Sequence, residues 1–257
     1  MMIVDVHAHM DFPDYRDDLD EVMRANEEAG VVGIVSQGTT VEANRRVLEL
    51  AEKYKTIKPA LGIYPVHVVD MSDNEFDAEI KFIREQKGRI VAIGEVGLDY
   101  LKGDDNPHGD TRKEVMRKRF QRFIDLAKKM DLPIICHSRR AELDVIEMLE
   151  KSGHKKVVMH CFMGRKHLVK RIVENGWSLS IPCIIGRLQQ LQENVAMAPI
   201  GQILTETDAP YMSPFPDTKR NEPRFIAESL KVIAKIKGLD VEETSKLIYL
   251  NYQKMFL

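Results

Sequence analysis

The stretch LPIICHSRRAELDVIEMLEKSGHKKVVMH (132–160) contains two short apolar runs separated by a longer segment with the spacing of a helix. Runs of four to eight β-branched and apolar residues are typical of buried strands, and the segment between them is long enough for a helix that connects parallel strands. Both apolar runs end in a histidine, His137 and His160. The stretch therefore predicts a strand–helix–strand unit with a polar residue at the end of each strand.

The same alternation of strand and helix extends along the whole chain. Strands are predicted at 2–6, 31–36, 56–62, 89–95, 132–137, 156–160, 177–181 and 202–206. The clearest helix covers 112–130, where apolar residues recur at steps of three and four, and a last helix is predicted at 238–256. Eight strands, each followed by a helix, in a chain of about 250 residues indicate an α/β fold of the (β/α)8 TIM-barrel type. We expect one domain over 1–257, with an extra C-terminal helix.

A doubly wound open sheet is the main alternative, because it also alternates strands and helices. The first strand is not followed by a GxGxxG motif, which is the commonest sign of that fold. The barrel is therefore preferred.

Composition excludes several classes of protein. Of the 257 residues, 44% are hydrophobic and 30% are charged, as in ordinary globular proteins. Lys and Arg number 38 against 40 Asp and Glu, so no global positive charge is available for nucleic acid and any such contact must be local. No signal peptide or membrane-spanning run is apparent, and three widely spaced cysteines favour reduced thiols. We expect a cytoplasmic protein that does not interact with membranes; its protein partners stay unknown.

Metal-capable side chains recur at the ends of the predicted strands, where barrels carry their active sites. They are His7 and His9 at the end of the first strand, Glu95 at the end of the fourth, His137 and His160 at the ends of the fifth and sixth, and Asp208 following the eighth. Any one of them could be a polar residue at the rim, and Asp208 alone could be a helix cap. Six such groups around one axis are costly to bury without bound cations, so together they predict a metal site.

The alternation of side chains along a strand places Asp5, His7 and His9 on one face, so both histidines can reach one ion. The same rule directs Cys136 and Cys161 away from the site, toward the helix layer. Histidine and carboxylate ligands suit Zn, Mn, Mg or a similar divalent ion, and six are too many for one catalytic zinc. We therefore expect two ions, one held by His7, His9 and Asp208, the other by His137 and His160, with Glu95 as the bridging ligand.

The motifs DVHAHMD, GEVGLDY, HSRRA, HCF and TDAPY, in this order, resemble those of the TatD family of metal-dependent deoxyribonucleases in the amidohydrolase superfamily. The resemblance implies a divalent-metal-dependent hydrolase that cleaves phosphodiester bonds of DNA, releasing nucleotides from the 3′ end. It implies the same six metal ligands, with Asp208 and Glu95 as catalytic residues and Asp208 handling the catalytic water. Substrate contacts are expected from Arg139, with His67 and Arg220 as further candidates.

The sequence departs from the family pattern at three places in loops expected to contact substrate. Tyr64 stands where the family has the first histidine of GxHPH, Met163 replaces a small polar residue, and Asp217 and Thr218 replace Arg and Gly. These differences leave the substrate open. A small amide, lactone or phosphoester is an alternative, and a non-catalytic binding protein that retains the site is a remote one.

Three further segments are assigned from their composition. The basic segment 111–122 is expected to be the solvated face of a helix rather than a nucleic-acid track. The Pro-rich loop 208–223 is expected to shape the substrate pocket. The segment 101–110 could be a lid, with His108 only a surface residue.

Overall fold

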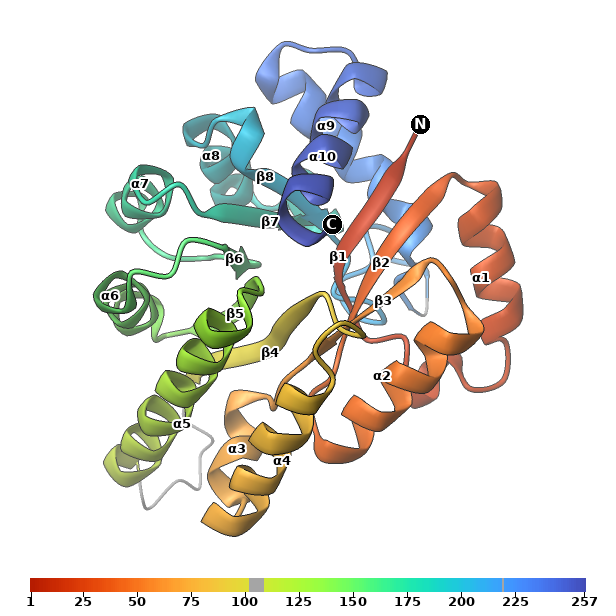
Figure 1. Ribbon diagram of the computed structural model, residues 1–257. Helices are drawn as coiled ribbons and strands as arrows, with labels where there is room; N and C mark the ends of the chain where they lie inside the picture. The colour runs from red at the N-terminus through yellow and green to blue at the C-terminus, as the bar shows by residue number, and fades with distance from the viewer. Residues whose placement is uncertain (102–108, 219) are drawn as a thin grey trace.

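A computed structural model describes residues 1–101, 109–218 and 220–257. Eight parallel strands pair in sequence order, β1 with β2 through to β7 with β8, and helices surround them (Figure 1). The strands are β1 (Ile3–Ala8), β2 (Val31–Gln37), β3 (Ile57–Leu61), β4 (Ala92–Asp99), β5 (Ile134–Arg139), β6 (Val157–His160), β7 (Ser178–Pro182) and β8 (Ile203–Glu206). The predicted (β/α)8 barrel is confirmed.

Hydrogen bonds between the two ends of the sheet close the barrel. The Thr205 hydroxyl donates to the carbonyl of Val4 at 2.7 Å. Just beyond, the Asp208 amide donates to the His7 carbonyl at 2.9 Å, and the His9 amide donates to the Ala209 carbonyl at 2.8 Å. The first and last strands therefore meet at the place where three of the predicted metal ligands lie.

The helices are α1 (Leu19–Glu28), α2 (Val41–Lys53), α3 (Pro65–Asp70), α4 (Asp73–Glu85), α5 (Gly109–Met130), α6 (Glu142–Ser152), α7 (Lys166–Glu174), α8 (Gln189–Met197), α9 (Ile226–Lys237) and α10 (Val241–Phe256). Local sequence sets their ends: Ser72 and Glu75 form a capping box at the start of α4, and Gly153 ends α6 in the left-handed conformation. No helix in these ranges is both long enough and apolar enough to cross a membrane.

All eight predicted strands are present, but several of them end later than expected. β4 begins at Ala92 and continues to Asp99, and β5 continues to Arg139. Glu95 and His137 therefore lie inside their strands and not at the ends, which corrects the prediction. The pairing of β4 with β5 shifts register between Ile93 and Val96, and this irregularity hides the end of β4 from a simple period-2 pattern.

The extra C-terminal helix is confirmed, with a later start. Gly238 is the left-handed cap of α9, and Asp240 caps the first turn of α10 through the Glu243 amide, so the predicted start at 238 was three residues early. The predicted lid at 101–110 and His108 lie almost wholly outside the described residues.

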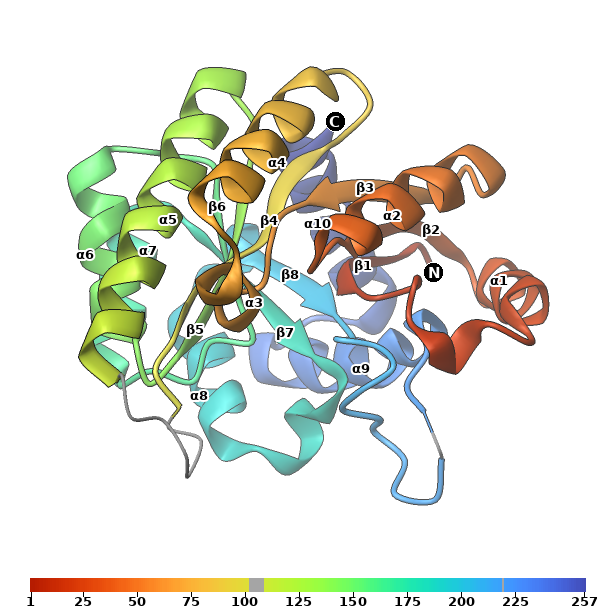
Figure 2. The ribbon, with the colours of Figure 1, turned by 90° about the horizontal axis from the view of Figure 1, so that it is seen from below.

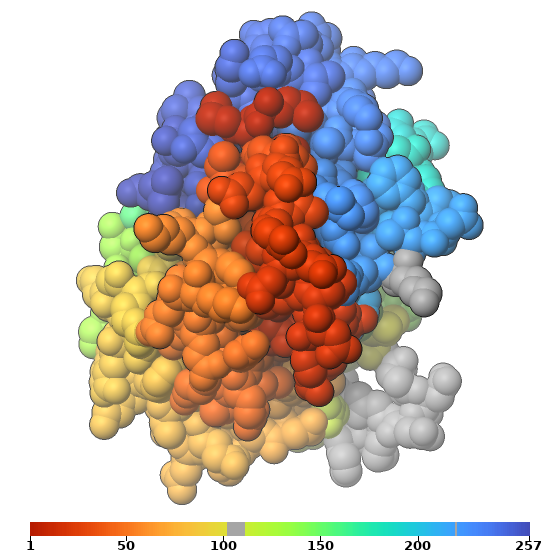
Figure 3. All heavy atoms as spheres, turned by 90° about the vertical axis from the view of Figure 1, so that its right-hand side faces the viewer, coloured from red at the N-terminus to blue at the C-terminus, as the bar shows by residue number. Residues whose placement is uncertain are grey.

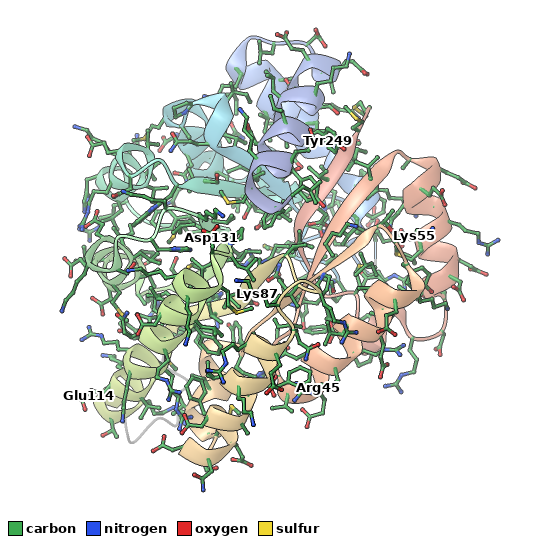
Figure 4. The ribbon with its side chains drawn as sticks, in the orientation of Figure 1. Arg45, Lys55, Lys87, Glu114, Asp131 and Tyr249 are labelled. Carbon is green, nitrogen blue, oxygen red and sulfur yellow. The ribbon has the colours of Figure 1, made fainter. Side chains whose placement is uncertain are left out.

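The amino ends of the strands are joined by turns, whereas longer loops follow the carboxyl ends. Figure 4 labels Lys87 and Asp131 near the middle of the view, where the turns that precede β4 and β5 lie, so this view faces the amino ends of the strands. In Figure 2 the arrows of β7 and β8 point toward the bottom of the picture, where the chain that follows them forms long loops. The candidate site belongs to that carboxyl end.

Candidate metal centre at the carboxyl end of the barrel

Four atoms, from β1, from β4 and from the residues just past the ends of β1 and β8, face one point. His7 Nε2 lies 3.6 Å from Glu95 Oε2 and 3.4 Å from Asp208 Oδ1. His9 Nε2 lies 3.6 Å and 3.3 Å from the same two oxygens. A regular tetrahedron with edges of this length has its centre about 2.0–2.2 Å from each corner, which is the range of Zn–N and Zn–O bonds. The spacing fits a single divalent ion.

Burial supports this reading. His7, His9 and Glu95 are each at most 3% exposed, yet both ring nitrogens of His7 and Nδ1 of His9 lack a hydrogen-bond partner among the described residues. Burying an imidazole without hydrogen-bond partners destabilises the fold, and a bond to a metal ion would offset this cost. These residues therefore fit a metal ion.

A second group of ligand atoms lies on the other side of Glu95. Glu95, His137 and His160 offer one ligand atom each within 4.8 Å of one another, and Glu95 Oε1 is 2.9 Å from His137 Nδ1. Glu95 thus contributes one oxygen toward each group. The rings of His7 and His160 stack at 3.6 Å between centroids, which holds the two groups against each other.

Carboxylates outside the two groups orient the second pair of histidines. His160 Nδ1 donates to Glu206 Oε2 at 2.8 Å, and His137 Nε2 donates to Asp99 Oδ2 at 3.3 Å. Each bond fixes the ring and directs the other nitrogen toward the site, as is usual for metal-binding histidines. Burial opposes a charge on His160, but the Glu206 carboxylate outweighs it and raises the pKa of His160 to about 10.

The two carboxylates of the site stay ionised. Burial opposes their ionisation, but the hydrogen bond from His137 and the nearby His7 ring hold the pKa of Glu95 well below its ordinary value. For Asp208, burial is likewise outweighed by the hydrogen bond from His9 and the charge of His160, and its pKa is lowered. Ionised carboxylates are the form that binds a cation.

The site opens into a hollow of about 430 Å³. Its wall contains the predicted substrate contacts Arg139 and His67, together with Tyr64, Phe12 and Tyr211. Arg139 donates from Nε and Nη2 to Asp99 at 2.9 Å and 2.7 Å, and half of its side chain is exposed. His67 Nδ1 donates to the carbonyl of Thr39 at 3.1 Å, since a carbonyl can only accept.

Arg220 does not line this hollow. Its guanidinium pairs with Asp18 and with the carbonyl of Asp14, and it lies over the Tyr15 ring. In Figure 3 the light-blue residues that follow β8 lie against the red residues that follow β1. The ion pair between Arg220 and Asp18 stabilises this contact. Arg220 thus ties the Pro-rich loop to the start of the chain.

Sequence reasoning missed the residues that support the site. Asp99 and Tyr211 lie in the recognised motifs GEVGLDY and TDAPY, and Glu206 directly precedes the second of them, but only the metal ligands in these motifs were identified. Period-2 spacing offered a signal, because Glu206 and Asp208 are two residues apart. The structure also gives a role for Tyr64, which departs from the family pattern. Its hydroxyl donates to Asp99 Oδ2 at 2.9 Å and so helps to position the carboxylate that orients His137 and Arg139.

The prediction for the cysteines is half right. Cys136 is completely buried in β5. Cys161 follows the end of β6 with a φ of 40°, and burial, together with the carboxylates of Glu206, Asp208 and Glu95, raises its pKa. The alternation of strand faces therefore does not extend to Cys161, which lies close to the site carboxylates.

A barrel with a buried histidine–carboxylate cluster at the carboxyl ends of its strands defines the class of metal-dependent hydrolase barrels. The family model described as TatD related DNase matches residues 4–257. Human deoxyribonuclease TATDN3 is 35% identical over 99% of this chain and 94% of its own length. YabD of Bacillus subtilis, named an uncharacterized metal-dependent hydrolase, is 35% identical over 99% of both chains.

Solved structures agree. The crystal structure of YjjV, a TatD homologue from Escherichia coli K12, superposes with a TM-score of 0.89 at 29% identity, over 99% of this chain and 97% of that one. The chain belongs to the TatD related DNase family, which confirms the resemblance seen in its motifs.

Proposed function

We propose that the protein is a deoxyribonuclease that uses two divalent ions to hydrolyse phosphodiester bonds in DNA. The observation that carries this proposal is the position of Glu95 between two groups of ligand atoms, with one oxygen toward each. His7, His9 and Asp208 would complete one group, and His137 and His160 the other. When bound, two such ions lower the pKa of a shared water and polarise a phosphoryl oxygen.

Asp208 is the residue best placed to handle the proton. Its carboxylate is ionised and lies 3.3 Å from His9 Nε2 through Oδ1, at the open side of the cluster. It would orient the attacking water and accept its proton as general base. Oxygen attack on phosphorus then breaks the bond to the leaving sugar oxygen, which takes up a proton.

Arg139 would neutralise charge on the phosphate. Two of its N–H groups are held by Asp99, so the guanidinium is fixed at the edge of the hollow while its remaining N–H groups are available. His67, whose Nδ1 is occupied by the Thr39 carbonyl, would present Nε2 to a sugar hydroxyl or to phosphate.

The proposed polarity is removal of nucleotides from the 3′ end of single strands. The hollow of about 430 Å³ is of the size that holds one small ligand, so it suits one terminal nucleotide better than a duplex. Tyr211, 56% exposed beside Phe12, offers an aromatic surface on which a base could stack.

A metal-reconstitution experiment tests the proposal. Chelator-treated protein would be loaded with Zn, Mn, Mg or Co and assayed on 3′- and 5′-labelled single-stranded DNA, a small phosphodiester and a lactone. We expect up to two ions per chain and stepwise shortening from the 3′ end. The Glu95→Ala variant should lose at least one ion and at least about a thousandfold in rate.

Glu174→Gln, on the exposed surface of α7, is the matched control and should retain both ions. Unchanged DNA cleavage by Glu95→Ala would exclude the shared-ligand mechanism. Lactone turnover without DNA cleavage would assign the protein to the alternative substrate class.

A further inference from the structure

We propose that a basic cleft beside the metal centre binds the single-stranded DNA chain beyond the nucleotide being removed. The cleft has a volume of about 610 Å³, and its wall includes Tyr100, Lys113, Arg117, Arg140, Met163 and Arg165. This inference rests on the proposed hydrolysis of DNA. It identifies which surface would hold the strand, and hence the length of substrate that the protein would prefer.

The cleft and the catalytic hollow are lined by consecutive residues of the chain. Arg139 lines the hollow and Arg140, the next residue, lines the cleft. The Tyr100 amide donates to the Arg139 carbonyl at 2.9 Å and fixes this wall to the end of β4. Met163 follows the ligand His160 by three residues. A strand that leaves the hollow therefore reaches the cleft by passing over residues 139 and 140.

The charge of the cleft suits a polyphosphate. Arg140 and Arg165 are exposed, and neither forms an ion pair with any other residue in the described ranges. His167 also lines the cleft, whereas the acids there are Glu142 and Asp144, and Asp144 is already paired with Arg117. In a chain with a formal charge of −2, this is a local positive surface of the kind that attracts nucleic acid.

The basic face of the neighbouring helix α5 differs from the cleft because most of its arginines form ion pairs. Arg112, Arg119 and Arg122 of α5 pair with Asp70, Asp73 and Asp77 of the adjoining helices. The basic segment 111–122 is therefore mostly an ion-paired surface, and Arg119 in it is buried, so it is not the fully solvated helix face that was expected. Only its members Lys113 and Arg117 extend to the cleft.

The part of the cleft formed by Met163 and Gly164 is held in place by α8. Gln190 donates to the carbonyls of Met163 and Gly164 at 2.6 Å and 2.8 Å, and Asn194 donates to the Phe162 carbonyl at 2.7 Å. Met163 is 37% exposed. It stands where the family pattern has a small polar residue, and its thioether gives the cleft a polarisable apolar surface for a base.

Binding of two thymidylate oligonucleotides, a 12-mer and a trimer with phosphorothioate linkages to prevent cleavage, tests this inference by fluorescence anisotropy. For Arg140→Gln/Arg165→Gln we expect the 12-mer-to-trimer affinity ratio to fall about tenfold. The slope of log affinity for the 12-mer against log salt should become shallower by about 1.4, because each phosphate contact on a single strand contributes about 0.7. Met163→Ser should weaken the 12-mer without changing this slope.

The charge-matched control is Lys231→Gln/Lys246→Gln, on the exposed faces of α9 and α10. It should stay within twofold of the parent. Equal losses in both double variants, an unchanged ratio in the cleft variant, or no preference of the parent for the 12-mer would overturn the inference. Failure of the parent to cleave any unmodified oligonucleotide would instead overturn the proposed function.

Discussion

Asp99 holds three neighbours of the metal centre at once. Its carboxylate accepts from the Tyr64 hydroxyl, from His137 Nε2 and from the Arg139 guanidinium. Burial opposes its charge, yet the hydrogen bonds from His137 and Arg139 lower its pKa. A single carboxylate thus sets both the ring orientation of one expected metal ligand and the position of one expected phosphate contact.

Replacing Asp99 should therefore weaken metal binding without removing a ligand. In Asp99→Asn the amide no longer carries the charge that orients His137, and loss of such a partner typically costs 10–100-fold in metal affinity. Titration of the chelator-treated protein with Zn or Mn measures the effect. Asp125→Asn, on the surface of α5, is the matched control. A metal affinity equal to that of the parent would show that Asp99 acts on the substrate alone.

His154 should make the folded state sensitive to acid at a place remote from the metal centre. Burial lowers the pKa of His154 from its ordinary value of 6.5. Its Nε2 donates to the Leu132 carbonyl, and its own carbonyl accepts from the Trp177 indole. As the pH falls below about 6.5, the unfolded chain takes up this proton first, so the free energy of unfolding decreases.

Urea unfolding at pH 7.5 and pH 5.5 measures this dependence. In His154→Gln the side chain keeps a donor for Leu132 and cannot titrate, so the loss of stability between the two pH values should be smaller than in the parent. An equal loss in both proteins would assign the acid sensitivity to other groups.

At the scale of single elements, β4 depends on a glycine that no other residue can replace. Gly97 has a φ of 146°, and a Cβ at this position would lie 2.0 Å from the backbone oxygen of His137. The pairing of β4 with β5 brings Gly97 opposite His137. The close approach of the two backbones therefore helps to position Glu95 and His137 on adjacent strands.

We expect Gly97→Ala to lower the free energy of unfolding by about 3 kcal/mol or more, because both the backbone conformation and the contact are unfavourable. Gly88→Ala is the matched control: its φ is 91°, but nothing lies within 4 Å of the added carbon. It should cost about 1 kcal/mol. Equal losses in the two variants, measured by denaturant unfolding, would show that the contact with His137 is not important.

The strands, and β4 in particular, show how much of the fold and of the site the sequence could predict. All eight strands were found, since buried parallel strands appear as short apolar runs. The ligand residues were found because histidines and acids interrupt those runs. The true end of β4 was missed because Gly94, Gly97 and a register shift interrupt the pattern, and register depends on contacts with β5 that are remote in sequence. Asp99 and Glu206 were missed because their role depends on which histidine lies opposite.

At the scale of the whole molecule, the metal centre should stabilise the fold. The proposed ligands come from β1 and the residue after it, from β4, β5 and β6, and from the residue two past the end of β8, so bound ions would connect most of the barrel. A ligand at a hundred times its dissociation constant adds about 2.7 kcal/mol to the free energy of unfolding. For a chain of this size, that corresponds to about 5–10 °C in Tm.

Thermal unfolding with and without a chelator measures this contribution. The parent should lose about 5–10 °C in Tm, and His7→Ala/His9→Ala should lose much less, since its first ligand group is already incomplete. Lys231→Gln should respond like the parent. A Tm of the parent that does not change on chelation would indicate that the ions contribute to chemistry and not to folding.

The junction of β1 and β8 has a consequence for the protein while it is being made. His7 and Asp208 belong to one proposed ligand group, and the chain must be extended by 201 residues (208 − 7) from the first to the second. At the usual pace of 5–20 residues per second, synthesis of that length takes about 10–40 s. Throughout this interval the nascent chain lacks the proposed general base, Asp208, and the closing contact of its barrel. The proposed nuclease would therefore stay inactive on the ribosome until Asp208, two residues past the last strand, has emerged.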